Sequence, residues 1–348
     1  MFLLVLAVAL LVVAALIAVE RLQADEAEEA EKADKSASPV QREGADPRVW
    51  PADLIVPSDR SFKADQIEDL GYAPEVIFFG GSRSVRFEPS YVREKTKLKG
   101  FNLATSGGKP EDAWAFAHLL YDRSPQTKLR WIWGIQPWTF TDRQLGAGLI
   151  QDPRLNKYFP DDLLRQQGKA LPQTPDEVPK NRRGYDWRFA RDGTILWNFH
   201  DKKLAEGWTL ERELEKYIAK IPRTGAEDPD DAAAAITPPE RTRALTYFED
   251  TLGYLNEHGV VPILVGMPIQ PTALEALLEA GRQRSYPSFL AYVDSLHEKY
   301  DFEFIDLREI ETFGGDPTDF YDVVHMKFAN SRRVIDKLLE TYPEQFAK

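Results

Sequence analysis

The stretch "EVIFFGGSRSVRFEP", residues 75–89, combines the pattern of a buried strand with the first candidate for chemistry. Its apolar run Val76–Phe79 stops at Gly80-Gly81, and Ser82 follows at once. A near-continuous apolar run is typical of a strand that is covered on both faces. Because two glycines let the backbone bend sharply, the pattern predicts that Ser82 is presented at the carboxyl edge of a sheet. An ordinary surface turn is the alternative interpretation.

Strand patterns recur along the chain and alternate with helical patterns. The predicted strands cover residues 75–80, 99–104, 129–136, 260–268 and 302–307. The predicted helices, with apolar residues three and four apart, cover residues 110–123, 238–259, 287–300 and 330–342. Such alternation is typical of a parallel sheet with helices on both faces. We therefore predict a flavodoxin-like, three-layer α/β/α fold with a five-stranded parallel sheet.

Residues from about 138 to 237 do not fit this alternation. They are rich in Pro, Asp, Arg and aromatic residues, and they are far more numerous than a plain crossover requires. We predict a large insertion above the sheet, with a turn at Asp192-Gly193. Four of its side chains either line a sugar- or carboxylate-binding surface or form the insertion's own small core: Tyr185, Trp187, Arg188 and Trp197.

The N-terminal segment Met1–Val19 contains no charged residue. At about 1.5 Å per residue it spans roughly 28 Å, close to the thickness of a bilayer's hydrocarbon core. We predict an uncleaved transmembrane anchor, with a cleaved signal peptide and a buried core helix as the alternatives. Residues 20–47 form an acidic, Ala-rich segment typical of a solvated linker, so the folded domain is expected over 48–348. That domain is expected outside the cytoplasm, periplasmic or extracellular, and secreted if the N-terminus is cleaved.

Composition narrows the class of protein. The chain has 348 residues, of which 43% are hydrophobic and 29% charged, as is ordinary for a folded domain. Its net charge of −12 argues against nucleic acid as a partner, because phosphates bind basic surfaces. With no cysteine, the chain has no disulfide, no cysteine nucleophile and no thiolate metal site.

Asp322 and His325 lie three residues apart, before the last predicted helix. A carboxylate at this spacing can orient an imidazole, which then takes the proton of a hydroxyl. After the second strand, "NLATSGG" places Gly107 and Gly108 just before a helix, where N–H groups favour developing negative charge. Gln136 follows the third strand and carries another N–H donor.

Because the carboxyl ends of parallel strands share one edge, these groups are predicted to meet Ser82. The neighbouring Arg83 either binds an anionic group or pairs with an acid, and Ser84 is the rival serine. No metal or other cofactor is expected, since no second histidine lies near the acids and His325 in the sequence. The remaining histidines are expected to be structural or solvated: His118, His200, His258 and His297.

The blocks "GGS", "NLATSGG", "GIQ" and "DVVH", in this order, resemble the SGNH/GDSL hydrolase superfamily. The likeness is greatest to its membrane-anchored, cell-envelope branch, with alginate-acetylation-type and DltD-like proteins, and covers roughly residues 74–137 and 240–340. The resemblance implies Ser82 as nucleophile and as one oxyanion donor through its backbone N–H. It further implies Gly107 as a second donor, His325 as base and Asp322 as its orienting acid.

Two positions depart from the family pattern. Gly81 stands where the family usually has Asp, and Gln136 stands where it has the Asn of Gly-x-Asn-Asp. Loss of one oxyanion donor costs about 10²–10³ in rate, so Gln136 is the more serious departure.

Three functions follow as hypotheses. The first is a serine-dependent acyl-ester hydrolase or O-acyltransferase that acts on an envelope glycan or another ester. The second is an inactive SGNH-like module that binds or assembles envelope polysaccharide. The third, a flavodoxin-like nucleotide or phosphate binder, lacks the glycine-rich phosphate loop that it needs.

Overall fold

The computed structural model describes residues 48–49, 58–125, 128–169, 187–221, 242–282 and 286–347. The predicted membrane anchor (1–19) and acidic linker (20–47) lie outside these residues, so both stay predictions. Within the described part of the chain, no helix combines the length and the apolar character that a membrane crossing requires.

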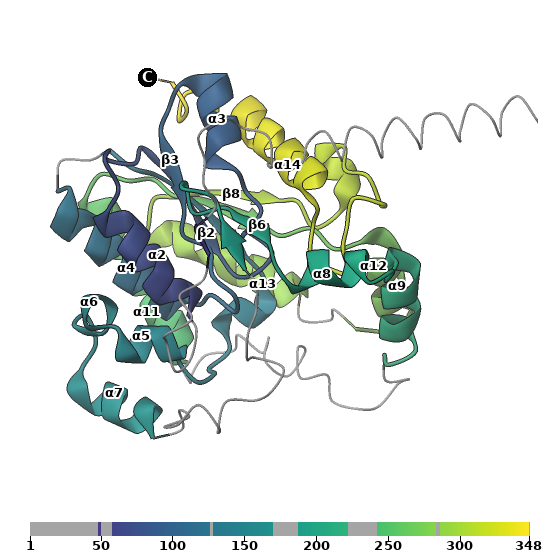
Figure 1. The fold of residues 1–348 in the computed structure, drawn as a ribbon, viewed down its shortest axis with the longest axis horizontal. Coiled ribbons are helices and arrows are strands. Elements are labelled where there is room, and N and C mark those ends of the chain that lie inside the picture. Colours follow the sequence, from purple (N-terminus) through teal and green to yellow (C-terminus); the bar gives the residue numbers. More distant parts are fainter. Residues whose placement is uncertain are drawn as a thin grey trace, which may run out of the picture. The chain divides into compact units, whose positions relative to one another are not determined.

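Five parallel strands form the main sheet (Figure 1). They are β2 (Val76–Gly80), β3 (Gly100–Asn102), β4 (Arg130–Ile135), β7 (Ile263–Gly266) and β8 (Glu303–Asp306). Their order across the sheet is β3-β2-β4-β7-β8, which is the order of flavodoxin-like sheets. Each strand lies inside a predicted segment; four strands are buried almost throughout, whereas the edge strand β8 is half-buried with Glu303 exposed. The prediction of a five-stranded parallel sheet is therefore confirmed.

Helices cover both faces of this sheet. Because successive strand side chains point to opposite faces, Ile77 and Phe79 join one hydrophobic core while Val76 and Phe78 join another. The first core includes residues of α2 (Asp59–Glu68), α4 (Pro110–Arg123), α11 (Arg243–Glu257) and α13 (Tyr286–Ser295). The second core includes residues of α3 (Pro89–Thr96) and α14 (Phe328–Thr341). In Figure 1, α3 and α14 lie above the sheet, and α2, α4 and α11 lie below it.

Helix ends follow their capping residues. α4 has the predicted bounds. Lys109 precedes its first turn, and the Lys109 N–H donates a hydrogen bond of 2.9 Å to the Asp112 carboxylate. α11 begins five residues later than predicted because the Thr242 hydroxyl caps it, accepting from the Leu245 N–H at 3.0 Å. The predicted helix 287–300 is α13 followed by a 3₁₀ turn, η5 (Leu296–Glu298).

The described part of the insertion contains short elements rather than one crossover helix. These are η2 (Pro137–Phe140), α5 (Ala147–Gln151), α6 (Pro153–Asn156), α7 (Asp161–Gly168), β5 (Arg188–Phe189), β6 (Ile195–Trp197), α8 (Phe199–Ala205) and α9 (Leu210–Ile218). Outside it lie β1 (Arg48–Val49), α12 (Pro271–Glu279) and η6 (Ile310–Phe313). β1, β5 and β6 form a small antiparallel sheet.

The insertion's aromatic residues differ in burial, and the core that holds Trp187 also includes Phe62, Val85 and Ala104 from outside the insertion. Trp187 is buried with Phe189 in a small core, whereas Trp197 is half-buried and lies 5.7 Å from the guanidinium of the exposed Arg188. Tyr185 lies outside the described residues. The predicted turn is present, because Gly193 has a φ of +81° between β5 and β6.

Candidate functional site

The bend after β2 depends on Gly80. Its φ is +140°, and a Cβ there would lie 2.5 Å from Ser84 Oγ and 2.9 Å from the Gly134 carbonyl oxygen. At Gly81 the nearest neighbours of a Cβ would be 3.7–3.8 Å away, which is ordinary contact distance. The bend was predicted to need both glycines, but the positive φ and the close contacts belong to Gly80. Ser82, half-buried, follows this bend.

Ser82, His325 and Asp322 form a hydrogen-bonded chain. His325 Nε2 lies 2.8 Å from Ser82 Oγ, and His325 Nδ1 lies 2.9 and 2.8 Å from the two Asp322 carboxylate oxygens. With the carboxylate as acceptor, Nδ1 carries the ring proton, and the Nε2 lone pair faces the hydroxyl. The structure thus brings together the three residues that the sequence predicted to meet. Their catalytic role stays a prediction.

The loop that carries His325 is closed by Asp322 itself. Its Oδ1 accepts hydrogen bonds from the N–H groups of Val324 and His325, both at 2.9 Å. Burial alone would raise the pKa of Asp322, but the charge of His325 and its hydrogen bond outweigh burial and hold this pKa well below its usual range. The carboxylate is therefore ionised at neutral pH and can orient and stabilise an imidazolium.

The turn after β3 lies against the bend that carries Ser82. A Cβ at Gly108 would lie 2.3 Å from the Gly80 carbonyl oxygen, so only glycine fits there. The Gly108 N–H donates to the Thr105 carbonyl at 2.9 Å and is already used. Gly107 is exposed with a φ of +62°, and no described residue accepts a hydrogen bond from its N–H. Gly107 is therefore the glycine whose N–H can serve a ligand.

A buried amide ties the two turns together. Asn102 Nδ2 donates to the carbonyls of Ser84 at 2.9 Å and Phe87 at 2.7 Å, and its Oδ1 accepts from the Ala104 N–H at 2.9 Å. Lys63, fully buried, donates to the Asn102 carbonyl at 2.8 Å and also to that of Ala104. Burial lowers the pKa of Lys63 to about 7. These contacts fix the relative positions of the β2 and β3 ends.

Gln136 follows β4 and lies beside the same bend. It is 4% exposed, and its Nε2 lies 3.8 Å from the position that a Gly81 Cβ would occupy. Its Oε1 is buried without a hydrogen-bond partner among the described residues. An unpartnered amide oxygen can accept a hydrogen bond from a ligand, whereas a donor role would fall to Nε2 of the same amide.

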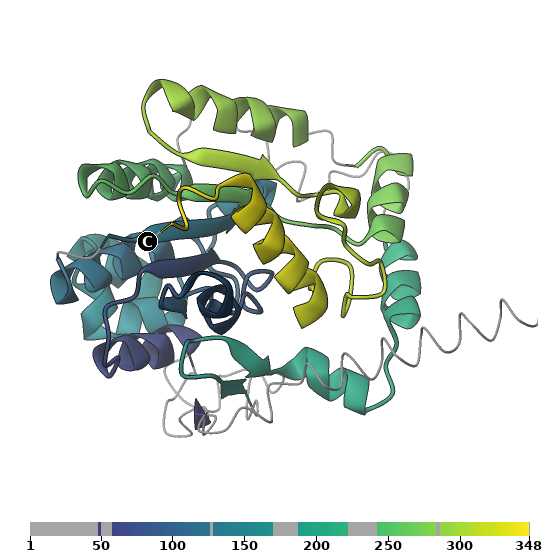
Figure 2. The same cartoon turned by 90° about the horizontal axis from the view of Figure 1, so that it is seen from above.

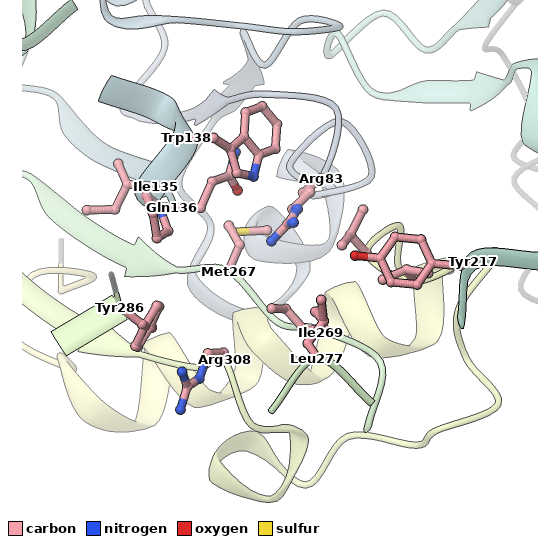
Figure 3. Close-up of a pocket in the computed structure, with 13 residues that line it drawn as sticks. Arg83, Ile135, Gln136, Trp138, Tyr217, Met267, Ile269, Leu277, Tyr286 and Arg308 are labelled. Carbon is pink, nitrogen blue, oxygen red and sulfur yellow. The ribbon is translucent and has the colours of Figure 1, made fainter. Parts of the chain in front are cut away.

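Two neighbouring cavities, of about 50 and 520 Å³, lie next to this constellation. Both are lined by Arg83, Trp138, Tyr217, Val323 and Val324. Figure 3 shows the smaller one, where Gln136 and Arg308 also take part. Asp322 lines the larger one, but Ser82 and His325 line neither. Both cavities therefore approach Ser82 through the adjacent Arg83, and the larger one also approaches His325 through Asp322.

The larger cavity has a surplus of positive charge although the whole chain is acidic. Its cations are Arg83, Arg143, Lys216 and Lys220, and its acids are Glu213 and Asp322. Both acids already have partners: Glu213 pairs with Lys203 at 2.9 Å and Asp322 with His325. The guanidinium groups of Arg83 and Arg143 lie 5.5 and 5.8 Å from the Trp138 ring. This lining suits an anion attached to a group that packs on an aromatic face.

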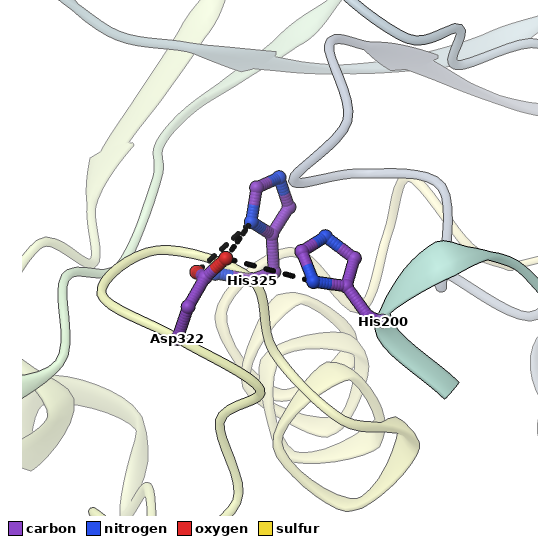
Figure 4. A group of neighbouring side chains, drawn as sticks. All are labelled: His200, Asp322 and His325. Carbon is purple, nitrogen blue, oxygen red and sulfur yellow. Dashed lines mark hydrogen bonds and ion pairs between the residues drawn. The ribbon is translucent and has the colours of Figure 1, made fainter. Parts of the chain in front are cut away.

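His200 is the site residue that sequence reasoning missed. It comes from α8 in the insertion, and its Nδ1 lies 3.6 Å from Asp322 Oδ2 (Figure 4). The ring centroids of His200 and His325 are 4.3 Å apart, and His200 is only 6% exposed. The other histidines predicted to be structural lie elsewhere: His118 packs among aromatic rings, His258 bonds the Tyr254 carbonyl and His297 stacks on Phe302.

The ligand atoms of His200, Asp322 and His325 lie within 4.8 Å of one another, close enough to hold a metal ion. A metal-bound histidine almost always donates its other ring N–H to a partner. His200 Nε2 is buried and has no such partner among the described residues, and His325 Nδ1 is already hydrogen-bonded to Asp322. The group therefore fits a hydrogen-bonded triad with a packed histidine better than it fits a metal centre.

Comparison with known proteins adds no family to this description, because no protein-family model and no curated protein matches the chain.

Proposed function

We propose that the chain is a serine-dependent acyl-ester hydrolase or O-acyltransferase of the SGNH/GDSL type. The observation that carries this proposal is the 2.8 Å contact between Ser82 Oγ and His325 Nε2, with Asp322 on the other ring nitrogen. Ser82 Oγ attacks the ester carbonyl carbon while His325 takes the hydroxyl proton. The ester C–O bond then breaks, and His325 returns this proton to the leaving alcohol. Water or a sugar hydroxyl attacks the acyl-enzyme next, with His325 again as base; the bond between the acyl carbon and Ser82 Oγ then breaks, and His325 returns the proton to Ser82 Oγ.

Three N–H groups support the negative charge that forms on the carbonyl oxygen. Ser82 and Gly107 contribute backbone N–H groups, since no described residue accepts a hydrogen bond from either. Gln136 contributes its side-chain amide, which lies beside the Ser82 bend. In this proposal the extra methylene of Gln lets the amide reach the site from the end of β4, in place of the family's Asn.

The cavities favour an ester on an anionic glycan. Arg83, buried and adjacent to Ser82, offers a guanidinium to a carboxylate or phosphate, while Trp138 and Tyr217 offer aromatic faces to a sugar ring. A location at the cell envelope rests on the predicted anchor over residues 1–19.

A second candidate is a binding module without activity. It is favoured by the absence of Ser82 and His325 from both cavity linings and by Gln136 in place of Asn. In that case the cavity holds an anionic glycan and no acyl-enzyme forms.

Labelling with a fluorophosphonate and turnover of p-nitrophenyl acetate separate the two candidates. The full-length chain is compared with Ser82→Ala, His325→Ala and the control Ser84→Ala, whose hydroxyl is fully buried against Met267. We expect labelling in the wild type and in Ser84→Ala and none in Ser82→Ala, with turnover reduced by orders of magnitude in both triad variants. Equal turnover in Ser82→Ala contradicts the enzyme proposal. A wild type that is neither labelled nor active supports the binding module.

A further inference from the structure

Helix α8 of the insertion is bonded to both loops of the candidate triad. The Asp201 carboxylate on this helix accepts a hydrogen bond from the buried Arg86, in the segment that follows Ser82. It also accepts one from the Tyr321 hydroxyl at 2.8 Å, and Tyr321 immediately precedes Asp322. Figure 2 shows α8, in teal, beside the yellow loop that leads into α14. The Asp201 carboxylate of the insertion therefore connects the segment that follows Ser82 to the loop that carries Asp322 and His325.

His200 precedes Asp201 and is held in a defined position. Its backbone N–H donates to Asn198 Oδ1 at 2.9 Å, which caps the first turn of α8. Its ring packs against the His325 ring, with Tyr321 on another side at a centroid distance of 5.5 Å. The side chains of His325 and Asp322 are 18% and 20% exposed, and His200, at 6%, covers part of what would otherwise face solvent.

We propose that His200 is a positioning residue that completes the triad, a role that rests on the proposed function. Its ring keeps the His325 imidazole in the plane that serves both Ser82 and Asp322. It also excludes water from the Asp322–His325 hydrogen bond, which is stronger in a dry environment. At 3.6 Å, its Nδ1 is beyond hydrogen-bond distance of Asp322, so packing and exclusion of water carry the effect.

This role requires a neutral ring, because an imidazolium would compete with His325 for Asp322. Burial, and next the charge of His325, lower the pKa of His200 to about 2, and Asp322 opposes them. The other charged groups that act on the ring are Arg86 and Lys203, which lower this pKa further. His200 is therefore uncharged wherever the proposed enzyme works.

The kinetic test replaces His200 in the full-length chain and uses Lys202→Ala as control. Lys202 belongs to the same helix, and its side chain is 69% exposed. We expect His200→Ala to lower kcat by about 10- to 100-fold with KM changed less than about twofold, and Lys202→Ala to leave both unchanged. His200→Phe keeps a ring on His325 and is expected to recover most of the lost rate.

A second measurement does not depend on activity. Exchange of the His325 ring C2 hydrogen, followed by mass spectrometry, reports how well water reaches the imidazole. We expect faster exchange in His200→Ala and wild-type exchange in Lys202→Ala and His200→Phe. This result supports the packing of His200 on His325 and its exclusion of water. If Ser82→Ala keeps full turnover, the proposed chemistry is wrong and the positioning role falls with it, although the packing result stands. If His200→Ala does not fold, kcat and exchange are measured on His200→Phe instead. Wild-type kcat and exchange in His200→Ala, or a Phe variant as impaired as the Ala variant, would overturn the proposal.

Discussion

Replacing Asn102 by alanine removes the buried amide that ties the Ser82 bend to the end of β3. Asn102 is fully buried, and its amide forms three hydrogen bonds of 2.7–2.9 Å with the backbone of Ser84, Phe87 and Ala104. A buried backbone group that loses its partner costs about 1–3 kcal/mol. Three such groups predict a loss of about 3–9 kcal/mol in the free energy of unfolding, with the lower end expected if water enters the space. Whole domains have only about 5–15 kcal/mol, so this loss is large.

Urea denaturation of the full-length chain measures the effect, from the midpoint and the slope of the transition. Asn156→Ala is the matched control, because Asn156 is half-buried and its amide donates one hydrogen bond, to the Ile150 carbonyl at 2.9 Å. The control is expected to lose about 1 kcal/mol. If Asn102→Ala loses no more than Asn156→Ala, the amide does not hold the two turns together and our account of the bend is wrong. Ester turnover is expected to fall in Asn102→Ala as well, because Ser82 then leaves its position beside His325.

Three further predictions concern the same sheet edge. Gln136→Ala is expected to lower kcat by about 10²–10³, and turnover close to that of the wild type would show that the amide is not an oxyanion donor. Gly108→Ala places a Cβ 2.3 Å from the Gly80 carbonyl oxygen and is expected to cost about 1–3 kcal/mol in urea denaturation. Gly81→Ala, which has room, serves as comparison, and equal losses would contradict the packing argument. Relative to Lys63→Met, the wild type is expected to gain about 2 kcal/mol of stability between about pH 7 and 9. The folded-state pKa of Lys63, about 7, lies below 10.5, so the unfolded chain binds more protons in this window; a pH-independent difference would show that the ammonium form persists.

Much of the fold could be predicted because four of the five strands of the main sheet are buried almost throughout. A continuous apolar run such as Val76–Phe79 is unfavourable at the surface. It therefore predicts both a strand and its position in the central layer of the fold. The contact between Asp322 and His325 could be predicted from their spacing in the sequence. The contact between His325 and Ser82 could be predicted because parallel strands end at one edge of the sheet. The roles of the individual glycines could not be predicted from the sequence. "GGS" does not reveal that Gly80 alone needs positive φ, and "SGG" does not reveal that the Gly108 N–H is already used.

The contribution of the insertion could not be predicted, for a physical reason. Its elements are short and derive their positions from tertiary contacts such as that between Asp201 and Arg86, for which no periodicity exists in the sequence. The motif around His200 shows only an Asn198 cap followed by a short helix. Lys63 was equally hidden, because a lysine on an amphipathic helix normally faces solvent.

The separation of 243 positions along the chain between Ser82 and His325 has a consequence for how the protein matures. On a ribosome, Ser82 is made 243 positions before His325. Contacts of such long sequence separation form slowly. In the proposed mechanism a nascent or truncated chain therefore carries a chemically inert serine, and it is spared from acylating its surroundings before the last loop docks. Reactivity at this position would then report that folding has reached completion.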